Sequence, residues 1–174
     1  MGRATIGLMR CRPLVCLLLL AVAAPAFAAD DRNPLTRARQ LYNMRDYARA
    51  VQAADEAHRV PEHADSADLI AARALLERFR ESANQADMDQ ARARLRRAAP
   101  ERFTERERVE WTVGLGEALF FDGAAGGAAA VFDSVLEAAD APLADGRERV
   151  LDWWATAVDQ DARPRGDADR QQAF

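Results

Sequence analysis

Residues 46–61, DYARAVQAADEAHRVP, decide the fold. The apolar and weakly polar side chains of this stretch recur at intervals of three and four residues: Tyr47, Ala50, Val51, Ala54, Ala57 and His58. That spacing places them on one face of an α-helix. Pro61 cannot continue a helix, so the helix ends before it. Because half of these side chains are alanine, another helix can approach the face closely.

Helical periodicity continues on both sides of this stretch, and no long strand-like alternation occurs. The pattern predicts seven helices. The first begins at Pro34, the second near residue 47, the fifth after Thr104 and the sixth after Gly127. The third, fourth and seventh span about 66–81, 87–99 and 147–160. Asn33 before Pro34 is a capping signal, and Thr104 with Glu107 has the form of a capping box. The sequence therefore predicts an all-α fold.

Prolines follow every second predicted helix, at positions 61, 100 and 142. Each helix pair has an apolar face that it cannot bury alone, so pairs at a regular interval must stack on their neighbours. This regularity is typical of an α-solenoid.

The series resembles the tetratricopeptide repeat family. DYARA at residues 46–50, followed by Ala54, Ala57 and Pro61, is similar to the second helix of one repeat unit. In the third pair, Gly116 stands at the small position of the first helix, and Ala128 and Phe132 stand at the expected places in the second.

The middle unit matches less well. DMDQA at residues 87–91, with Leu95 and Pro100, is a weaker copy, and bulky Phe79 stands near a position where the family has a small residue. The intervals also exceed the family's usual length, so an insertion is expected at about 81–86. The resemblance covers residues 34–160. It implies a right-handed α-solenoid of antiparallel helix pairs, about three and a half of them, within residues 29–162.

The resemblance also assigns roles to residues. Close helix contacts are expected at Tyr47, Ala50, Ala54, Ala57, Ala91, Gly116, Ala128 and Phe132. A concave groove that holds a protein or peptide is expected to include Arg39, Tyr42, Asn43, Glu117, Phe120 and Phe121. Tyr42 and Phe120 would anchor the ligand, and the polar members would set its register.

Other classes of function find little support in the composition. The net charge of −4 argues against nucleic acid as a partner. Both cysteines fall within the first sixteen positions, which excludes a disulfide scaffold, a cysteine-ligated zinc site and a cysteine nucleophile later in the chain. His58 and His63 lie five residues apart across Pro61, which is not the spacing of a helical metal site. We expect no metal, no cofactor and no enzyme activity.

Residues 1–28 have the form of a signal peptide. Arg3, Arg10 and Arg12 precede an apolar run at 14–24, and Ala26-Phe27-Ala28 supplies small residues for cleavage between Ala28 and Ala29. The run of eleven residues is shorter than the roughly 20 that span a bilayer, so no stable membrane insertion is expected after cleavage. The sequence predicts a periplasmic or secreted protein.

The last helix carries Trp153 and Trp154, which cannot both face the same side of one helical turn. One ring should pack inside, and the other is either covered by a missing element or exposed to a partner. Residues 163–174 are expected to form a charged linker and the start of a truncated helix. Self-association through the last helix would follow. The alternative to groove binding is a spacer or assembly module of an envelope complex that uses its convex face and this edge.

Overall fold

The computed structural model describes residues 33–138 and 146–163. Within these ranges the chain forms seven α-helices and no strand: α2 (Pro34–Asn43), α3 (Tyr47–Ala57), α4 (Ala64–Ser82), α5 (Gln85–Arg97), α6 (Glu105–Phe121), α7 (Ala125–Glu137) and α8 (Arg147–Ala162). The predicted all-α class is confirmed. The predicted signal peptide, its cleavage site, Pro142 and residues 164–174 lie outside the described residues.

Both predicted N-terminal caps are confirmed. The Asn33 side chain accepts a hydrogen bond from the Leu35 amide at 2.9 Å, and Pro34 follows as the first helical residue of α2. At the start of α6 the Glu107 amide donates to the Thr104 hydroxyl at 3.3 Å, and the Glu107 carboxylate accepts from the Thr104 amide at 3.1 Å. These bonds satisfy amides that have no partner inside the helix.

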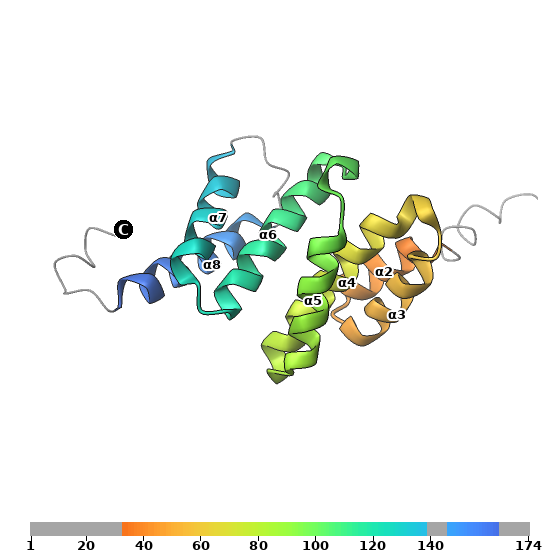
Figure 1. The fold of residues 1–174 in the computed structure, drawn as a ribbon, viewed down its shortest axis with the longest axis horizontal. Coiled ribbons are helices and arrows are strands. Elements are labelled where there is room, and N and C mark those ends of the chain that lie inside the picture. The colour runs from red at the N-terminus through yellow and green to blue at the C-terminus, as the bar shows by residue number, and fades with distance from the viewer. Residues whose placement is uncertain (1–32, 139–145, 164–174) are drawn as a thin grey trace, which may run out of the picture.

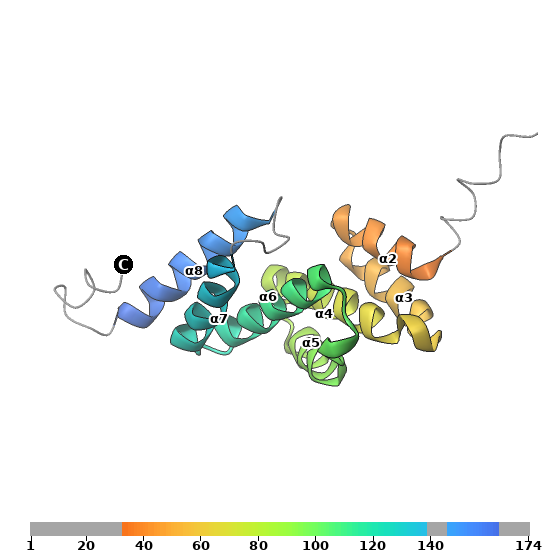
Figure 2. The ribbon, with the colours of Figure 1, turned by 90° about the horizontal axis from the view of Figure 1, so that it is seen from above.

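Successive helices pack against one another along the molecule, as Figure 1 shows, with the least extensive contact between α5 and α6. A single-turn helix, η2 (Pro100–Arg102), connects these two helices, and α6 also packs against α4. The Trp111 indole of α6 donates to the Leu95 carbonyl of α5 at 3.0 Å, which joins them directly. Seen from above, α2 and α8 stand on one side of α4 and α6, and α5 lies on the other side (Figure 2).

The eight residues expected at close helix contacts are all buried. Gly116 shows why a small residue is needed, because a Cβ there would lie 2.5 Å from a ring carbon of Phe132. In the N-terminal half the corresponding contacts are made by alanines. One buried cluster consists almost entirely of them: Ala38, Ala53, Ala54, Ala57, Ala67 and Ala71, with Ile70.

The turns that join α2 to α3 and α6 to α7 have similar backbone conformations and the same pattern of backbone hydrogen bonds. In each turn one residue adopts a left-handed conformation, Arg45 at φ 61° and Gly123 at φ 78°. The two turns also share their amide-to-carbonyl bonds, at 2.9–3.0 Å: Arg45 to Tyr42, Asp46 to Leu41, Gly123 to Phe120 and Ala124 to Leu119. Glycine is the usual residue for this conformation, so the arginine is the exception.

Candidate binding groove

The structure contains a cavity of about 740 Å³, which we call the groove. Its walls come from α2, α4, α6 and α8, together with the α2–α3 turn, the first residue of α3 and the cap of α6. Its lining is Arg39, Tyr42, Asn43, Arg45, Tyr47, Ile70, Arg73, Thr104, Arg106, Glu107, Val109, Glu110, Val113, Gly146, Arg149 and Val150. Helices from both ends of the described chain therefore contribute to one surface.

Glu107 forms the most completely bonded part of the wall. Its carboxylate pairs with Arg39 of α2, and it accepts hydrogen bonds from the Ser66 hydroxyl at 2.7 Å and from Thr104. Burial alone would raise the pKa of Glu107, but the bonds from Ser66, Thr104 and Arg39 together lower it below its ordinary value. Glu107 is therefore held as a carboxylate that links α2, α4 and α6.

Arg73 of α4 lies deeper, against Tyr42. Its guanidinium carbon lies 4.9 Å from the centre of the Tyr42 ring, in cation–π geometry, and Tyr42 in turn lies 5.7 Å from the Tyr47 ring. One terminal nitrogen of Arg73 is 3.3 Å from the Glu110 carboxylate, whereas its buried Nε finds no hydrogen-bond partner among the described residues. Burial raises the pKa of the Tyr42 hydroxyl, and Arg73 opposes that shift. Tyr42 is therefore a neutral platform for the arginine.

Glu117 of α6 is only 4% exposed, and no described residue forms a hydrogen bond or ion pair with it. Burial raises the pKa of its carboxyl, and Arg73 partly offsets that effect. The neighbouring Glu77 does have direct partners. Arg80 donates a hydrogen bond to it at 2.9 Å, and Arg149 of α8 lies 3.8 Å away. The interior next to the groove thus holds an acid without a direct partner.

The structure brings together three of the six residues predicted for the groove, Arg39, Tyr42 and Asn43. Glu117, Phe120 and Phe121 do not line this cavity. The two phenylalanines instead pack edge-on against Trp153 of α8, with ring centres 4.9 Å and 5.5 Å away. Their aromatic character thus serves the contact between α6 and α8.

Trp153 and Trp154 both pack against the buried cluster that joins α6, α7 and α8. The Trp153 ring lies at a stacking angle to Phe132, 6.4 Å away, and Trp154 is half-buried. The neighbouring Leu151 is 41% exposed, so it is the large apolar side chain that α8 leaves open.

Sequence reasoning missed Arg73 and Arg149. Both belong to helices that the resemblance did not map onto the groove, α4 and α8. A charged residue within the apolar stretch of α4 was a usable signal for Arg73, since arginine is rarely buried without a partner. No comparable signal marked Arg149.

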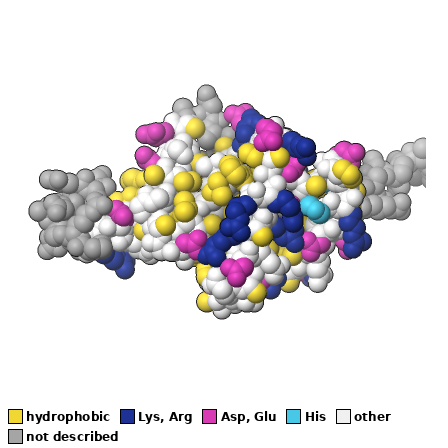
Figure 3. All heavy atoms as spheres, viewed as in Figure 1, with side chains coloured by type: hydrophobic (Ala, Val, Ile, Leu, Met, Phe, Trp, Pro, Cys, Tyr) yellow, Lys and Arg dark blue, Asp and Glu magenta, His cyan; other side chains and the backbone are white. Residues whose placement is uncertain are grey.

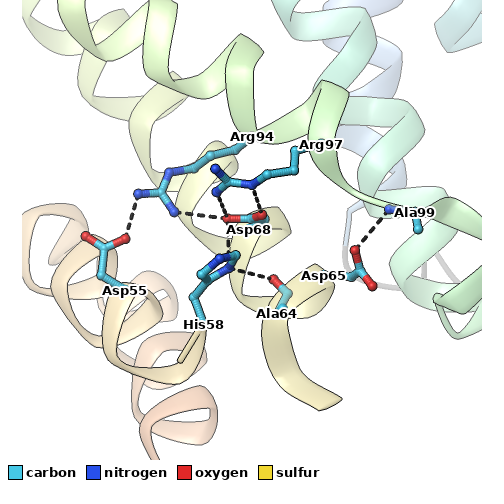
Figure 4. A network of polar contacts seen from close by, with 8 residues as sticks. All are labelled: Asp55, His58, Ala64, Asp65, Asp68, Arg94, Arg97 and Ala99. Carbon is cyan, nitrogen blue, oxygen red and sulfur yellow. Dashed lines mark hydrogen bonds and ion pairs between the residues drawn. The ribbon is translucent and has the colours of Figure 1, made fainter. Parts of the chain in front are cut away.

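A second cluster of charges lies on the side of α4 that faces α3 and α5 (Figure 4). Asp68 is 2% exposed, and Arg97 donates to both of its oxygens, at 2.7 Å and 2.6 Å. Arg94 donates to Asp68 at 3.2 Å and to Asp55 at 2.6 Å. Figure 3 shows arginine side chains gathered near α5 on this face, with a histidine beside them.

His58 ends α3 within the same cluster. Its Nδ1 lies 3.3 Å from the Ala64 carbonyl and 3.3 Å from Asp68, so the ring bridges α3 and α4. Among the described residues no group of three or more His, Cys, Asp or Glu side chains is placed to hold a metal ion.

No helix within residues 33–138 and 146–163 combines the length and apolar character of a membrane span. A scan of protein-family models and searches of curated proteins and of solved structures gave no match to this chain.

Proposed function

We propose that this chain is a non-enzymatic, tetratricopeptide-like scaffold of the bacterial envelope that holds a peptide or a segment of a partner protein in the groove. Each helix packs on the next in chain order, and this series is compatible with the pairs α2–α3, α4–α5 and α6–α7 followed by α8. The first helix of each pair contributes to the groove, as does α8. This supports a right-handed solenoid of three and a half pairs whose concave side is the groove.

The groove carries the proposal, because Arg39, Tyr42 and Asn43 come together there with residues of α4, α6 and α8. A cavity of about 740 Å³ lies within the size range of ligand sites. Tyrosine and arginine are the residue types that contribute most to protein recognition. Export to the periplasm belongs to the same proposal, and mass spectrometry of the native protein should find Ala29 at its N-terminus.

The test begins with selection of peptides from an unbiased display library on the purified full chain. The affinity of a selected peptide is then measured by fluorescence anisotropy for the wild type and for Asn43→Trp, which fills the groove from an exposed position. We expect Asn43→Trp to weaken binding about tenfold or more, equivalent to roughly 1.4 kcal/mol. Gln52→Trp places the same side chain on an exposed position of α3 outside the groove, and it should leave the affinity unchanged.

The alternative, an assembly module that uses the edge formed by α8, is favoured by exposed Leu151 next to half-buried Trp154. Leu151→Arg distinguishes the two functions. Binding that survives Asn43→Trp but is lost in Leu151→Arg would transfer the function to this edge. Failure to select any peptide would contradict groove binding.

A further inference from the structure

We propose that the segment held in the groove is acidic, and that its carboxylates lie between Arg45 in the α2–α3 turn and Arg149 on α8. This inference rests on the proposed function and specifies the chemistry of the partner. It depends on three observations: the balance of charge in the groove, the pairing of each charge, and the backbone at Arg45.

The groove is locally basic in an acidic protein. Five arginines and two glutamates line it, whereas the whole chain carries a formal charge of −4. The surplus therefore does not follow from the overall composition. A concave surface lined by one sign of charge concentrates the field and attracts ligands of the opposite sign.

The glutamates in the lining are already neutralised. Glu107 pairs with Arg39, and Glu110 lies 3.3 Å from Arg73 and 3.0 Å from Arg106. Two arginines remain without a close ion pair, although the buried Glu77 and Glu117 lie near Arg149. Arg45 forms no hydrogen bond or ion pair through its side chain with any described residue, and the ion pair of Arg149 with Glu77 is long, at 3.8 Å.

These two arginines stand on different walls and remain accessible. Arg45 is exposed, and the Arg149 side chain retains 50% of its exposure. The half-buried ring of Tyr42 also lines the cavity, and it offers aromatic surface to a chain lying across it. An arginine pairs with a carboxylate, as it does with a phosphate, through two parallel hydrogen bonds, and in an unmodified peptide the carboxylate is the group available.

The backbone gives independent reason to assign a role to Arg45. Its φ of 61° is the left-handed conformation for which the equivalent turn between α6 and α7 has Gly123. A residue with a Cβ adopts this conformation at an energetic cost, and among the other described non-glycine residues only Ala83 also does so. Neither the turn nor any neighbouring described side chain requires an arginine, so what the residue provides is a positive charge at the rim of the groove.

The experiment uses two fluorescent peptides of equal length, one with glutamate at alternate positions around a central tyrosine and the other with glutamine in the same positions. Their affinities are measured by anisotropy at low and at physiological salt for the full chain and for Arg45→Gly and Arg149→Gln. The control is Arg96→Gln, which removes an exposed arginine from α5, outside the groove. Circular dichroism verifies that each variant is folded.

The glutamate peptide should bind more tightly than the glutamine peptide, and added salt should reduce the difference. Arg45→Gly and Arg149→Gln should each weaken its binding by roughly three- to fivefold, whereas Arg96→Gln should not. Equal binding of both peptides, no binding of either, or equal losses in all three variants would overturn the inference. The proposed function is judged separately. If a neutral peptide from the display library binds the wild type and loses its affinity only in Asn43→Trp, groove binding is supported and the acidic ligand is excluded.

Discussion

Two buried charged side chains of α4 differ in how completely they are paired. Asp68 faces α3 and α5, and Arg97, Arg94 and His58 surround its carboxylate. Arg73, five residues later, faces the groove with one ion pair at 3.3 Å and a buried Nε that has no described partner. A fully paired charge fixes how helices pack, whereas an incompletely paired one beside a cavity suits a surface kept for binding.

The largest expected effect breaks the paired side of this comparison. Asp68→Ala removes an acceptor of Arg97 and Arg94, and it should lower the free energy of unfolding by about 2–3 kcal/mol, because Arg97 can turn to solvent and Arg94 keeps Asp55. Urea denaturation followed by circular dichroism measures the change.

Asp55→Ala is the matched control, because Asp55 binds the same Arg94 from an exposed position. It should cost at most about 1 kcal/mol. Equal losses in the two variants would show that burial of Asp68 adds nothing to its pairing.

The second prediction extends the contrast to α6, where the bonds to Glu107 lower its pKa and burial raises the pKa of Glu117. Ionised Glu107 stabilises the fold above the pKa that it has in the unfolded chain, and this contribution is lost as pH falls through its lowered folded pKa. For Glu117 the stabilising form is protonated, so its contribution is complete at low pH and is lost as pH rises through its raised folded pKa.

At neutral pH, Glu107→Gln should therefore destabilise the fold by about 1–2 kcal/mol, and Glu117→Gln should stabilise it by about 1 kcal/mol. Both differences from the wild type should shrink as the pH is lowered towards 4. Urea midpoints measured across this pH range provide the check, and changes of the same sign in both variants would contradict the assignment.

The third prediction concerns Arg73 itself. Arg73→Met keeps much of the buried volume and removes a guanidinium whose Nε is unsatisfied, so it should cost about 1 kcal/mol or less despite the lost contact with Tyr42. Thermal unfolding measures this difference. A loss as large as that of Asp68→Ala would mean that Arg73, too, holds the helices together.

The smallest effect is expected at the rim of the groove. Arg45→Gly relieves a left-handed conformation and should raise the free energy of unfolding by about 0.5 kcal/mol. Gly123→Ala in the equivalent turn should change it in the opposite direction by a similar amount. The measurement is the shift in urea midpoint, and destabilisation by Arg45→Gly would show that the arginine supports the turn.

The sequence predicted the parts of this molecule that depend on local spacing. The caps at Asn33 and Thr104 follow from side chains that reach their own backbone, and the all-α class follows from apolar periodicity. The Asp68 cluster could not be predicted, because its members meet only after α3, α4 and α5 have packed. Phe120 was predicted to line the groove, but it packs against Trp153 of α8. Apolar periodicity does not reveal which face of α6 is covered by another helix.

The limited contact between α5 and α6 has a geometric consequence. The segment α2–α5 supplies one wall of the groove and α6–α8 supplies the other, so neither segment alone contains the cavity. Its width depends on the angle at which the two segments meet, and the bond from Trp111 to Leu95 lies at that junction. The junction is thus a point from which the shape of the groove can be altered without touching any residue that lines it.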